Sequence, residues 1–178
     1  MRCFAALHPS EAVRAAVAAA QDELRRAGAD VRWIGPGELH VTLRYFGDLD
    51  AAVVGRLRGS LARIAADQRK FRVAYQGVGE FPKVLWIGGS TGANALAAAI
   101  DAAAVETGLP KDRHGYTAHL TIGRIRSDRG AQALATAMVA LLDRDYGEDE
   151  ISEFSLMKST LTPQGPVYEV VEVFALRP

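Results

Sequence analysis

Two short segments of the sequence share one arrangement of histidine, threonine and apolar residues. They are residues 40–43 (HVTL) and residues 119–122 (HLTI). Side chains alternate between the two faces of a β-strand, so the histidine and threonine of each segment share one face and the two apolar residues share the other. Each segment is therefore typical of a strand that buries its apolar face and offers an imidazole beside a hydroxyl on the open face.

The paired groups suit displacement at a phosphorus atom. Such a reaction needs a base at the attacking oxygen and an acid at the leaving oxygen, and an imidazole with a pKa of about 6.5 can serve as either near neutral pH. Threonine hydroxyls can donate hydrogen bonds to the non-bridging oxygens as their charge grows. A single strand histidine is more often structural than catalytic, but a second copy of the motif makes a chance match much rarer. We therefore predict that His40, Thr42, His119 and Thr121 face one phosphate.

A bound metal is the competing interpretation of two histidines. Neither motif has a carboxylate in register, a second histidine one helical turn away, or a cysteine partner, which are common companions of a metal-ligating histidine. Arg44 has the strand parity of His40 and Thr42, so we expect it on their face, where its charge would repel a metal and attract a phosphate. The single cysteine, Cys3, lies in an apolar run and is expected to be a buried thiol. The sequence thus predicts no metal and no cofactor.

The elements that position the motifs recur in one order. Periodicity and turn residues predict a strand, a helix, a motif strand, a helix and a strand over residues 1–75, and the same order over residues 84–160. No low-complexity linker separates the copies, so we expect a single α+β domain, residues 1–178, whose two similar lobes contain His40 and His119 and face each other. The predicted helices cover 11–27, 51–66, 94–107 and 127–146, and the predicted strands cover 1–8, 31–34, 38–46, 71–75, 84–88, 116–125, 151–160 and 167–176, with a turn at 162–166.

Composition narrows the class of protein. Hydrophobic residues make up 49% of the chain and charged residues 24%, which is a globular balance. Lys and Arg number 21 and Asp and Glu number 21, so the net charge is zero, which argues against an extended nucleic-acid surface but allows a local basic pocket. Apolar runs are too short for a signal peptide or a membrane span, so we expect a cytoplasmic protein without a membrane partner. A monomer is the default expectation.

With these motifs in place, the chain resembles the two-histidine phosphoesterase superfamily. Within it, the chain is most similar to the RNA 2′,3′-cyclic phosphodiesterases, the LigT-like family also called 2′–5′ RNA ligases. The resemblance covers nearly the whole chain and implies lobes that are each an antiparallel sheet with helices packed outside, around a central cleft. The segments that carry it are residues 2–7 (RCFAAL), 31–34 (VRWI), 39–43 (LHVTL), 46–47 (FG), 84–88 (VLWIG), 119–124 (HLTIGR) and 161–168 (LTPQGPVY).

The resemblance implies hydrolysis of RNA 2′,3′-cyclic phosphate ends to 2′-phosphomonoesters, without metal or cofactor. It also implies that the joining reaction, which forms a 2′–5′ linkage, can run. By the same resemblance His40 is the proton donor to the leaving oxygen and His119 is the proton acceptor that activates water. Thr42 and Thr121 hold the phosphate.

Two further substrate-binding residues follow from the resemblance. Arg124 corresponds to a phosphate-binding cation, and Tyr45 corresponds to an aromatic residue that can stack on a base. Strict alternation puts neither side chain on the face of its histidine, so we expect the strand to bend or end before Arg124. The family usually has an Arg-Pro pair just before the second motif, where this chain has Thr117 and Ala118, so one cation of the family pattern is missing.

Two other functions stay open at the level of sequence. The substrate could be a nucleotide or ADP-ribose cyclic phosphate instead of an RNA end, since both motifs would be identical. Alternatively, the chain could be a non-catalytic RNA-end binding module. Intact His and Thr in both motifs speak against the second alternative, because binding alone does not need a paired acid and base. The expected partners are thus RNA ends or small cyclic-phosphate nucleotides.

Overall fold

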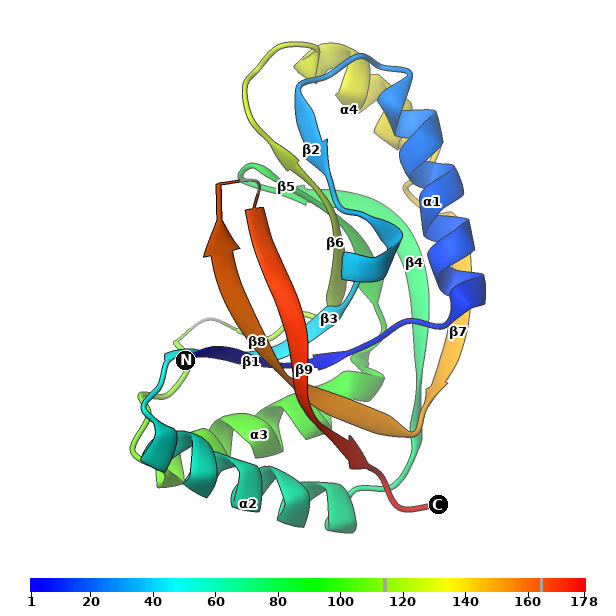
Figure 1. Ribbon diagram of the computed structural model, residues 1–178. Helices are drawn as coiled ribbons and strands as arrows, with labels where there is room; N and C mark the ends of the chain where they lie inside the picture. Colours follow the sequence, from blue (N-terminus) through cyan, green and yellow to red (C-terminus); the bar gives the residue numbers. More distant parts are fainter. Residues whose placement is uncertain (114, 164) are drawn as a thin grey trace.

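The protein's structure, a computed structural model, describes residues 1–113, 115–163 and 165–178 (Figure 1); residue 164 of the predicted turn lies outside this range. It has the expected α+β organisation, with strands joined into one sheet in the order β7-β4-β5-β6-β3-β1-β8-β9 and β2 added beside β6. The strands are β1 (Arg2–Leu7), β2 (Val31–Trp33), β3 (Val41–Asp48), β4 (Phe71–Phe81), β5 (Val84–Gly89), β6 (His119–Ile125), β7 (Asp145–Ile151), β8 (Glu153–Thr162) and β9 (Gly165–Ala175), and the helices are α1 (Glu11–Arg25), α2 (Ala51–Asp67), α3 (Asn94–Glu106) and α4 (Ala131–Val139).

The sheet consists of two antiparallel halves joined at one point. One half is β7-β4-β5-β6 and the other is β3-β1-β8-β9. Between β3 and β6 a single residue pair, Val41 opposite Leu120, connects them. Both residues are fully buried, and each directly follows one of the motif histidines. The seam of the sheet therefore lies at the two motifs.

The halves are not continuous in sequence. The first predicted copy supplies β1 and β3, but its closing strand, β4, pairs with β5 and β7 of the other half. Conversely, β8, the closing strand of the second copy, pairs with β1 of the other half. The two lobes exist, but each closing strand is exchanged between them, which Figure 1 shows as an orange strand beside a blue one.

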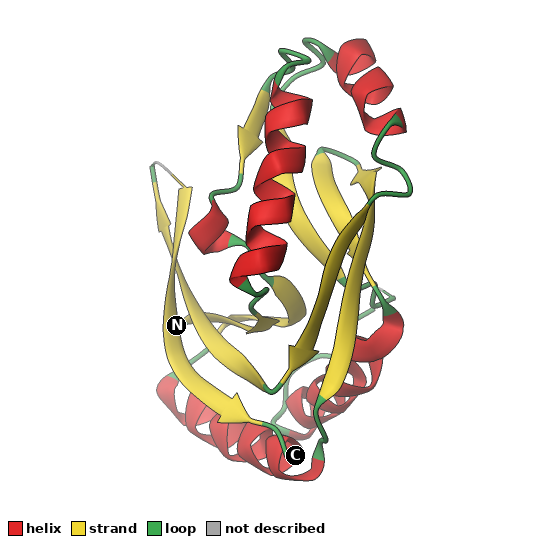
Figure 2. Ribbon diagram, turned by 90° about the vertical axis from the view of Figure 1, so that its right-hand side faces the viewer, coloured by secondary structure: helices red, strands yellow, loops and turns green. Residues whose placement is uncertain are grey.

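The helices lie on the outside of the sheet, in two groups (Figure 2). The first group is α1 and α4, which pack on each other, and α1 also packs on β7. The second group is α2 and α3, which pack on each other; α2 also packs on β9, and α3 on β3. Ser10 caps α1: its hydroxyl accepts a hydrogen bond from the backbone N–H of Val13 at 3.3 Å. Within the described residues, no helix is long and apolar enough to cross a membrane.

Two predicted boundaries were wrong. The helix expected over 127–146 is the short α4, and residues 145–151 instead form β7, an edge strand whose charged residues hid its alternation. The strand expected over 71–75 continues to Phe81 as β4. Beyond Tyr75 the strand passes Gly77, which takes a left-handed φ of 69° at a register shift, and Gly79, over which Trp86 of β5 packs.

Candidate active site

The seam pair puts both motifs on one face of the sheet. Val41 and Leu120 are directly opposite each other, so their side chains point the same way, into the core. The neighbouring residues in each strand must then point to the other face. Burial follows this alternation as the sequence predicted, since the apolar residues of both motifs are buried and the polar ones are half-buried. The half-buried residues are His40, Thr42, His119 and Thr121.

The same backbone contact holds each imidazole. Nδ1 of His40 lies 2.7 Å from the carbonyl oxygen of Glu38, and Nδ1 of His119 lies 2.8 Å from the carbonyl oxygen of Thr117. A carbonyl oxygen only accepts, so in each histidine Nδ1 carries a proton and donates it. Nε2 is left free, and it can act as a base in the neutral ring and as an acid in the protonated ring.

A β-bulge in β6 brings Arg124 to the face of His119. The register with β5 shifts by one residue between Thr121, which pairs with Trp86, and Gly123, which pairs with Leu85. One extra residue reverses the parity of the strand beyond it. Arg124 therefore shares the face of Thr121, although strict alternation would have turned it away. The expected bend before Arg124 is this bulge.

A second β-bulge acts in the same way in β3. Thr42 pairs with Ala6 of β1, but Ala5 pairs with Arg44, so one residue of β3 is extra. Tyr45 then pairs with Phe4 and shares the cleft face with it. Tyr45 stands five residues after His40, as Arg124 stands five residues after His119, so the two bulges preserve the pseudo-twofold relation of the motifs.

The prediction that Arg44 shares the face of His40 and Thr42 was wrong. The bulge turns Arg44 to the opposite face, where its Nε lies 2.8 Å from Oδ1 of Asp101 in α3 and its Nη2 donates to the carbonyl oxygen of Pro110 at 2.6 Å. Its guanidinium also lies 3.5 Å from a carboxylate oxygen of Asp112. Arg44 thus ties α3 and the following loop to β3 and does not line the cavity beside His40.

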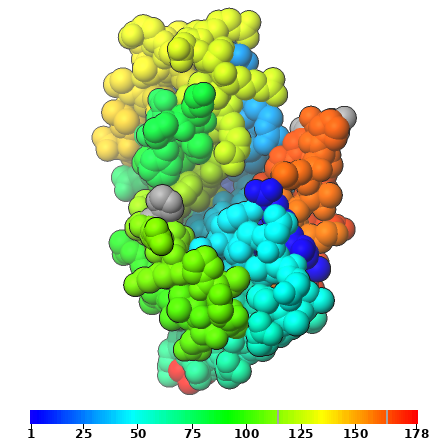
Figure 3. Space-filling model, turned by 90° about the vertical axis from the view of Figure 1, so that its left-hand side faces the viewer, coloured from blue at the N-terminus to red at the C-terminus, as the bar shows by residue number. Residues whose placement is uncertain are grey.

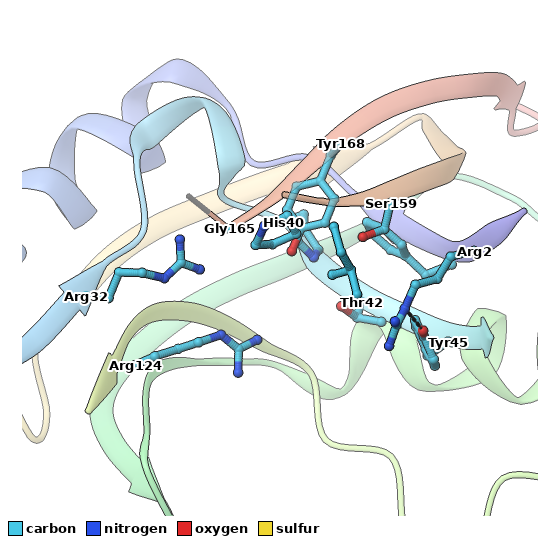
Figure 4. A pocket seen from close by; sticks show the side chains of 12 residues that line it. Arg2, Arg32, His40, Thr42, Tyr45, Arg124, Ser159, Gly165 and Tyr168 are labelled. Carbon is cyan, nitrogen blue, oxygen red and sulfur yellow. Dashed lines mark hydrogen bonds between the residues drawn. The ribbon is translucent and has the colours of Figure 1, made fainter. Parts of the chain in front are cut away.

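A cavity of about 480 Å³ opens beside the motifs, and three arginines point into it (Figure 4). On the molecular surface it corresponds to a hollow between the orange β8–β9 hairpin and the yellow-green β6 region (Figure 3). Among its described lining residues none is acidic. It reaches His40 and Thr42, whereas His119 and Thr121 lie outside its lining. The full lining is Arg2, Phe4, Arg32, His40, Thr42, Tyr45, Arg124, Ser159, Leu161, Gly165, Pro166 and Tyr168.

Aromatic rings flank both imidazoles. The ring of His40 has its centroid 5.0 Å from that of Phe4 and 5.2 Å from that of Tyr168. The centroid of the His119 ring lies 5.3 Å from that of Phe81, and the two rings are nearly perpendicular. Burial lowers the pKa of His40 below its ordinary value, and the hydrogen bond to the Glu38 carbonyl opposes this effect in part. Burial also raises the pKa of the Tyr168 phenol, which stays protonated at neutral pH.

Several residues at the cavity were not selected from the sequence. Arg2 donates a hydrogen bond from Nε to the Tyr45 hydroxyl and lies over its ring, 5.5 Å from the centroid, which fixes Tyr45 at the mouth (Figure 4). Arg32 enters from β2, and Tyr168 enters from the β8–β9 hairpin that folds over His40. Arg2 lies in β1, which pairs with β3, and Arg32 lies in β2, which pairs with β6, whereas Tyr168 lies in β9, which pairs with β8. The one available signal was that these residues fall in segments that carry the family resemblance.

Cys3 is buried, as expected, and burial raises the pKa of its thiol. Across residues 1–113, 115–163 and 165–178, no group of three or more His, Cys, Asp or Glu could hold a metal ion. The described side chains at the cleft include two imidazoles, two hydroxyls and arginine guanidinium groups.

Comparison with known proteins agrees with this geometry. The family model of the 2′-5′ RNA ligase superfamily matches residues 6–161. A protein of Methanothermobacter thermautotrophicus named RNA 2′,3′-cyclic phosphodiesterase is 33% identical, covering 99% of both chains. A protein of the same name from Aquifex aeolicus is 37% identical over 82% of this chain and 81% of its own.

Solved structures share the fold over nearly the whole chain. A crystal structure of a Thermus thermophilus protein has a TM-score of 0.83 at 28% identity, covering 99% of this chain and 98% of that one. Apo LigT of E. coli has a TM-score of 0.81 at 21% identity, with the same coverage. The doubled motif, the bilobal sheet and these matches lead to one conclusion: the chain belongs to the 2′-5′ RNA ligase superfamily.

Proposed function

We propose that this protein hydrolyses RNA 2′,3′-cyclic phosphate ends to 2′-phosphomonoesters. The observation that carries the proposal is the seam pair of Val41 and Leu120, which leaves two imidazoles and two hydroxyls on one face beside an arginine-lined cavity. Relatives that match this chain over nearly their full length bear the name RNA 2′,3′-cyclic phosphodiesterase, which supports the same reaction here.

In the proposed mechanism, Nε2 of His119 takes a proton from water as the water oxygen bonds to phosphorus. The bond from phosphorus to the 3′ oxygen breaks, and Nε2 of protonated His40 donates its proton to that oxygen. Thr42 and Thr121 donate hydrogen bonds to the non-bridging oxygens, whose charge grows in the transition state. The products are a 2′-phosphate and a 3′-hydroxyl. His119 then gives up a proton and His40 regains one before the next turnover.

The same proton transfers serve joining. With a 5′-hydroxyl of RNA in the place of water, the new bond to phosphorus makes a 2′–5′ linkage. Arg124 supplies positive charge to the phosphate, and Tyr45 offers an exposed ring at the mouth of the cavity for a base. One chain carries both motifs, which supports a monomer as the active unit, and RNA processing would take place in the cytoplasm.

We predict that His40→Gln and His119→Gln each lower kcat on a cyclic-ended oligonucleotide by about 10² to 10⁴-fold, the usual contribution of a general acid or base. Chromatographic analysis of the products measures both the rate and the position of the phosphate. His8→Gln is the matched control, since His8 directly follows β1 and does not line this cavity. A charge on His8 also lowers the pKa of His40, so each variant is measured at its own pH optimum, where His8→Gln should keep wild-type turnover. Unchanged turnover in both motif variants would contradict the proposal.

The same assay separates the remaining parts of the proposal. Full activity in excess EDTA is expected, and loss of activity that zinc or magnesium restores would contradict a metal-independent reaction.

A substrate with sulfur at the leaving 3′ position needs little help from an acid, since thiols ionise far more readily than alcohols. It should therefore rescue His40→Gln more than His119→Gln, and the opposite pattern would reverse the two roles. Nucleotide and ADP-ribose cyclic phosphates serve as competing substrates.

A further inference from the structure

Two arginines face each other across the junction of β2 and β6. Arg32 and Arg124 are directly opposed residues of this antiparallel pair, so their side chains leave the same face. Both point into the cavity beside His40 (Figure 4). Like charges directly opposite each other destabilise a strand pair. Among the described residues neither arginine forms an ion pair, so no direct ion pair there offsets the repulsion.

The guanidinium of Arg32 lies close to the start of β9. A Cβ added to Gly165 would lie 2.8 Å from Nη1 of Arg32, so the absence of a side chain at Gly165 leaves room for the guanidinium. The backbone φ of Gly165 is 131°, which favours glycine as well. The carbonyl oxygen of Gly165 accepts a hydrogen bond from the Thr162 hydroxyl at 2.6 Å, which fixes this end of the hairpin. Arg32 thus lies between β6 and the start of β9.

Arg32 also breaks the pseudo-symmetry of the cleft. β2 lies between α1 and β3, and the corresponding segment between α3 and β6 contains no strand among its described residues. The catalytic groups are therefore paired across the cleft, while the arginine pair lies at the β2–β6 end alone. A single reacting phosphate with two threonine hydroxyls and Arg124 does not need this second guanidinium.

We propose that Arg32 forms a second anion subsite, which binds the phosphate on the 5′ side of the terminal nucleoside, beside the reacting phosphate that Arg124 contacts. This inference rests on the proposed function and adds a substrate preference to it. A substrate that carries such a phosphate neutralises the opposed arginines and is bound more tightly than a nucleoside cyclic phosphate. Arg32 is in this view a specificity residue and takes no part in proton transfer.

The test compares three substrates: a nucleoside 2′,3′-cyclic phosphate, its 5′-phosphorylated form, and a dinucleotide that ends in a 2′,3′-cyclic phosphate. Arg32→Gln should lower kcat/KM on the dinucleotide by at least about tenfold, since a charge-assisted contact is lost. On the nucleoside cyclic phosphate it should change kcat/KM less than about twofold. The salt dependence of log kcat/KM on the dinucleotide should become shallower by about 0.7, the value for one phosphate contact in a single strand.

Matched variants and outcomes complete the test. Arg126→Gln removes a nearby exposed arginine that does not line the cavity and should leave all three substrates unaffected. Arg32→Lys keeps the charge but not the fork of donors, and should fall between wild type and Arg32→Gln. Loss on the 5′-phosphorylated nucleoside as well as the dinucleotide identifies any phosphate as the ligand, and loss on the dinucleotide alone identifies the RNA backbone.

Equal losses on all three substrates, or no loss on the dinucleotide, would overturn the second subsite while the proposed function stands. If the wild-type protein turned over none of the substrates, the proposed function would fail, and this inference with it. Removing one of two opposed like charges should not lower the thermal unfolding midpoint, so a fall in activity from misfolding would be visible as a lower midpoint.

Discussion

At the scale of single residues, the two histidines make the same backbone hydrogen bond and differ in their surroundings. Each donates from Nδ1 to the carbonyl oxygen two residues before it, so the difference between them comes from the rings around them. His40 lies between Phe4 and Tyr168, and its burial disfavours the charged imidazolium. The lowered pKa of His40 should therefore be visible in the pH dependence of catalysis.

We predict a bell-shaped pH profile of kcat/KM. One of its two limbs should have an apparent pKa below 6.5, the ordinary pKa of a histidine, because burial lowers the pKa of His40. Tyr168→Ala exposes this imidazole to water, which stabilises its protonated form, so the same limb should move to higher pH. Leu161→Ala is the control, since Leu161 lines the cavity but is 65% exposed and should leave the limb in place. A limb that stays fixed in Tyr168→Ala would refute this account of His40.

At the scale of elements, the site depends on close packing between β2 and β6. Gly123 is the residue of β6 that allows it, because an added Cβ would lie 2.7 Å from Cγ1 of Val31 and 3.3 Å from Cε3 of Trp33. The absence of a side chain at Gly123 thus brings β2 close enough to β6 for Arg32 to oppose Arg124.

Gly123→Ala should lower the free energy of unfolding by about 1–3 kcal/mol, the usual cost of overpacking a buried contact. The measurement is urea unfolding of Gly123→Ala, Val31→Ala and the double variant, as a double-mutant cycle. Because Val31→Ala removes the nearest clashing atom, the double variant should be more stable than the sum of the single effects predicts. Strict additivity would rule out this steric explanation.

Gly37→Ala is the matched glycine control for that experiment. Gly37 has no atom within 4 Å of an added Cβ, so its substitution should leave the free energy of unfolding almost unchanged. A loss in Gly37→Ala as large as that in Gly123→Ala would point to a general cost of replacing glycine rather than to the β2–β6 contact.

At the scale of the whole molecule, the exchange of closing strands makes the two lobes depend on each other. β4 is central in one half of the sheet, between β7 and β5, and β8 is central in the other half, between β1 and β9. The first half of the chain thus supplies β4 to the sheet half that contains β5, β6 and β7, and the second half supplies β8 and β9 to the sheet half that contains β1 and β3. The expectation of one domain over residues 1–178 can be tested through this dependence.

We predict that fragments 1–82 and 83–178, cut at the turn between β4 and β5, show no cooperative thermal unfolding when separate, because each leaves sheet edges unpaired. Mixed in equal amounts, they should regain a cooperative transition and hydrolysis of cyclic-ended RNA. Circular dichroism and the activity assay follow both properties. Independent folding of fragment 1–82 would contradict a single folding unit.

Sequence periodicity predicted the parts of this protein that depend on near neighbours in the chain. The burial alternation in both motifs and the positions of α1, α2 and α3 agree closely with the expected pattern. These features depend on which side chains repeat every second residue or every third and fourth, and that is readable without knowing any long-range contact.

Strand pairing determines which side chains share a face, and only the tertiary structure shows that pairing. The seam pair joins two motifs far apart in sequence, and two bulges bring Tyr45 and Arg124 to the cleft while turning Arg44 toward Asp101. A bulge changes strand parity through the register with a neighbouring strand, which short-range periodicity does not contain. For the same reason, short-range periodicity does not place Arg32 at the site, because its position there depends on the pairing of β2 with β6. The sequence by itself determined which chemistry the motifs can perform, and long-range register decided which other side chains join them.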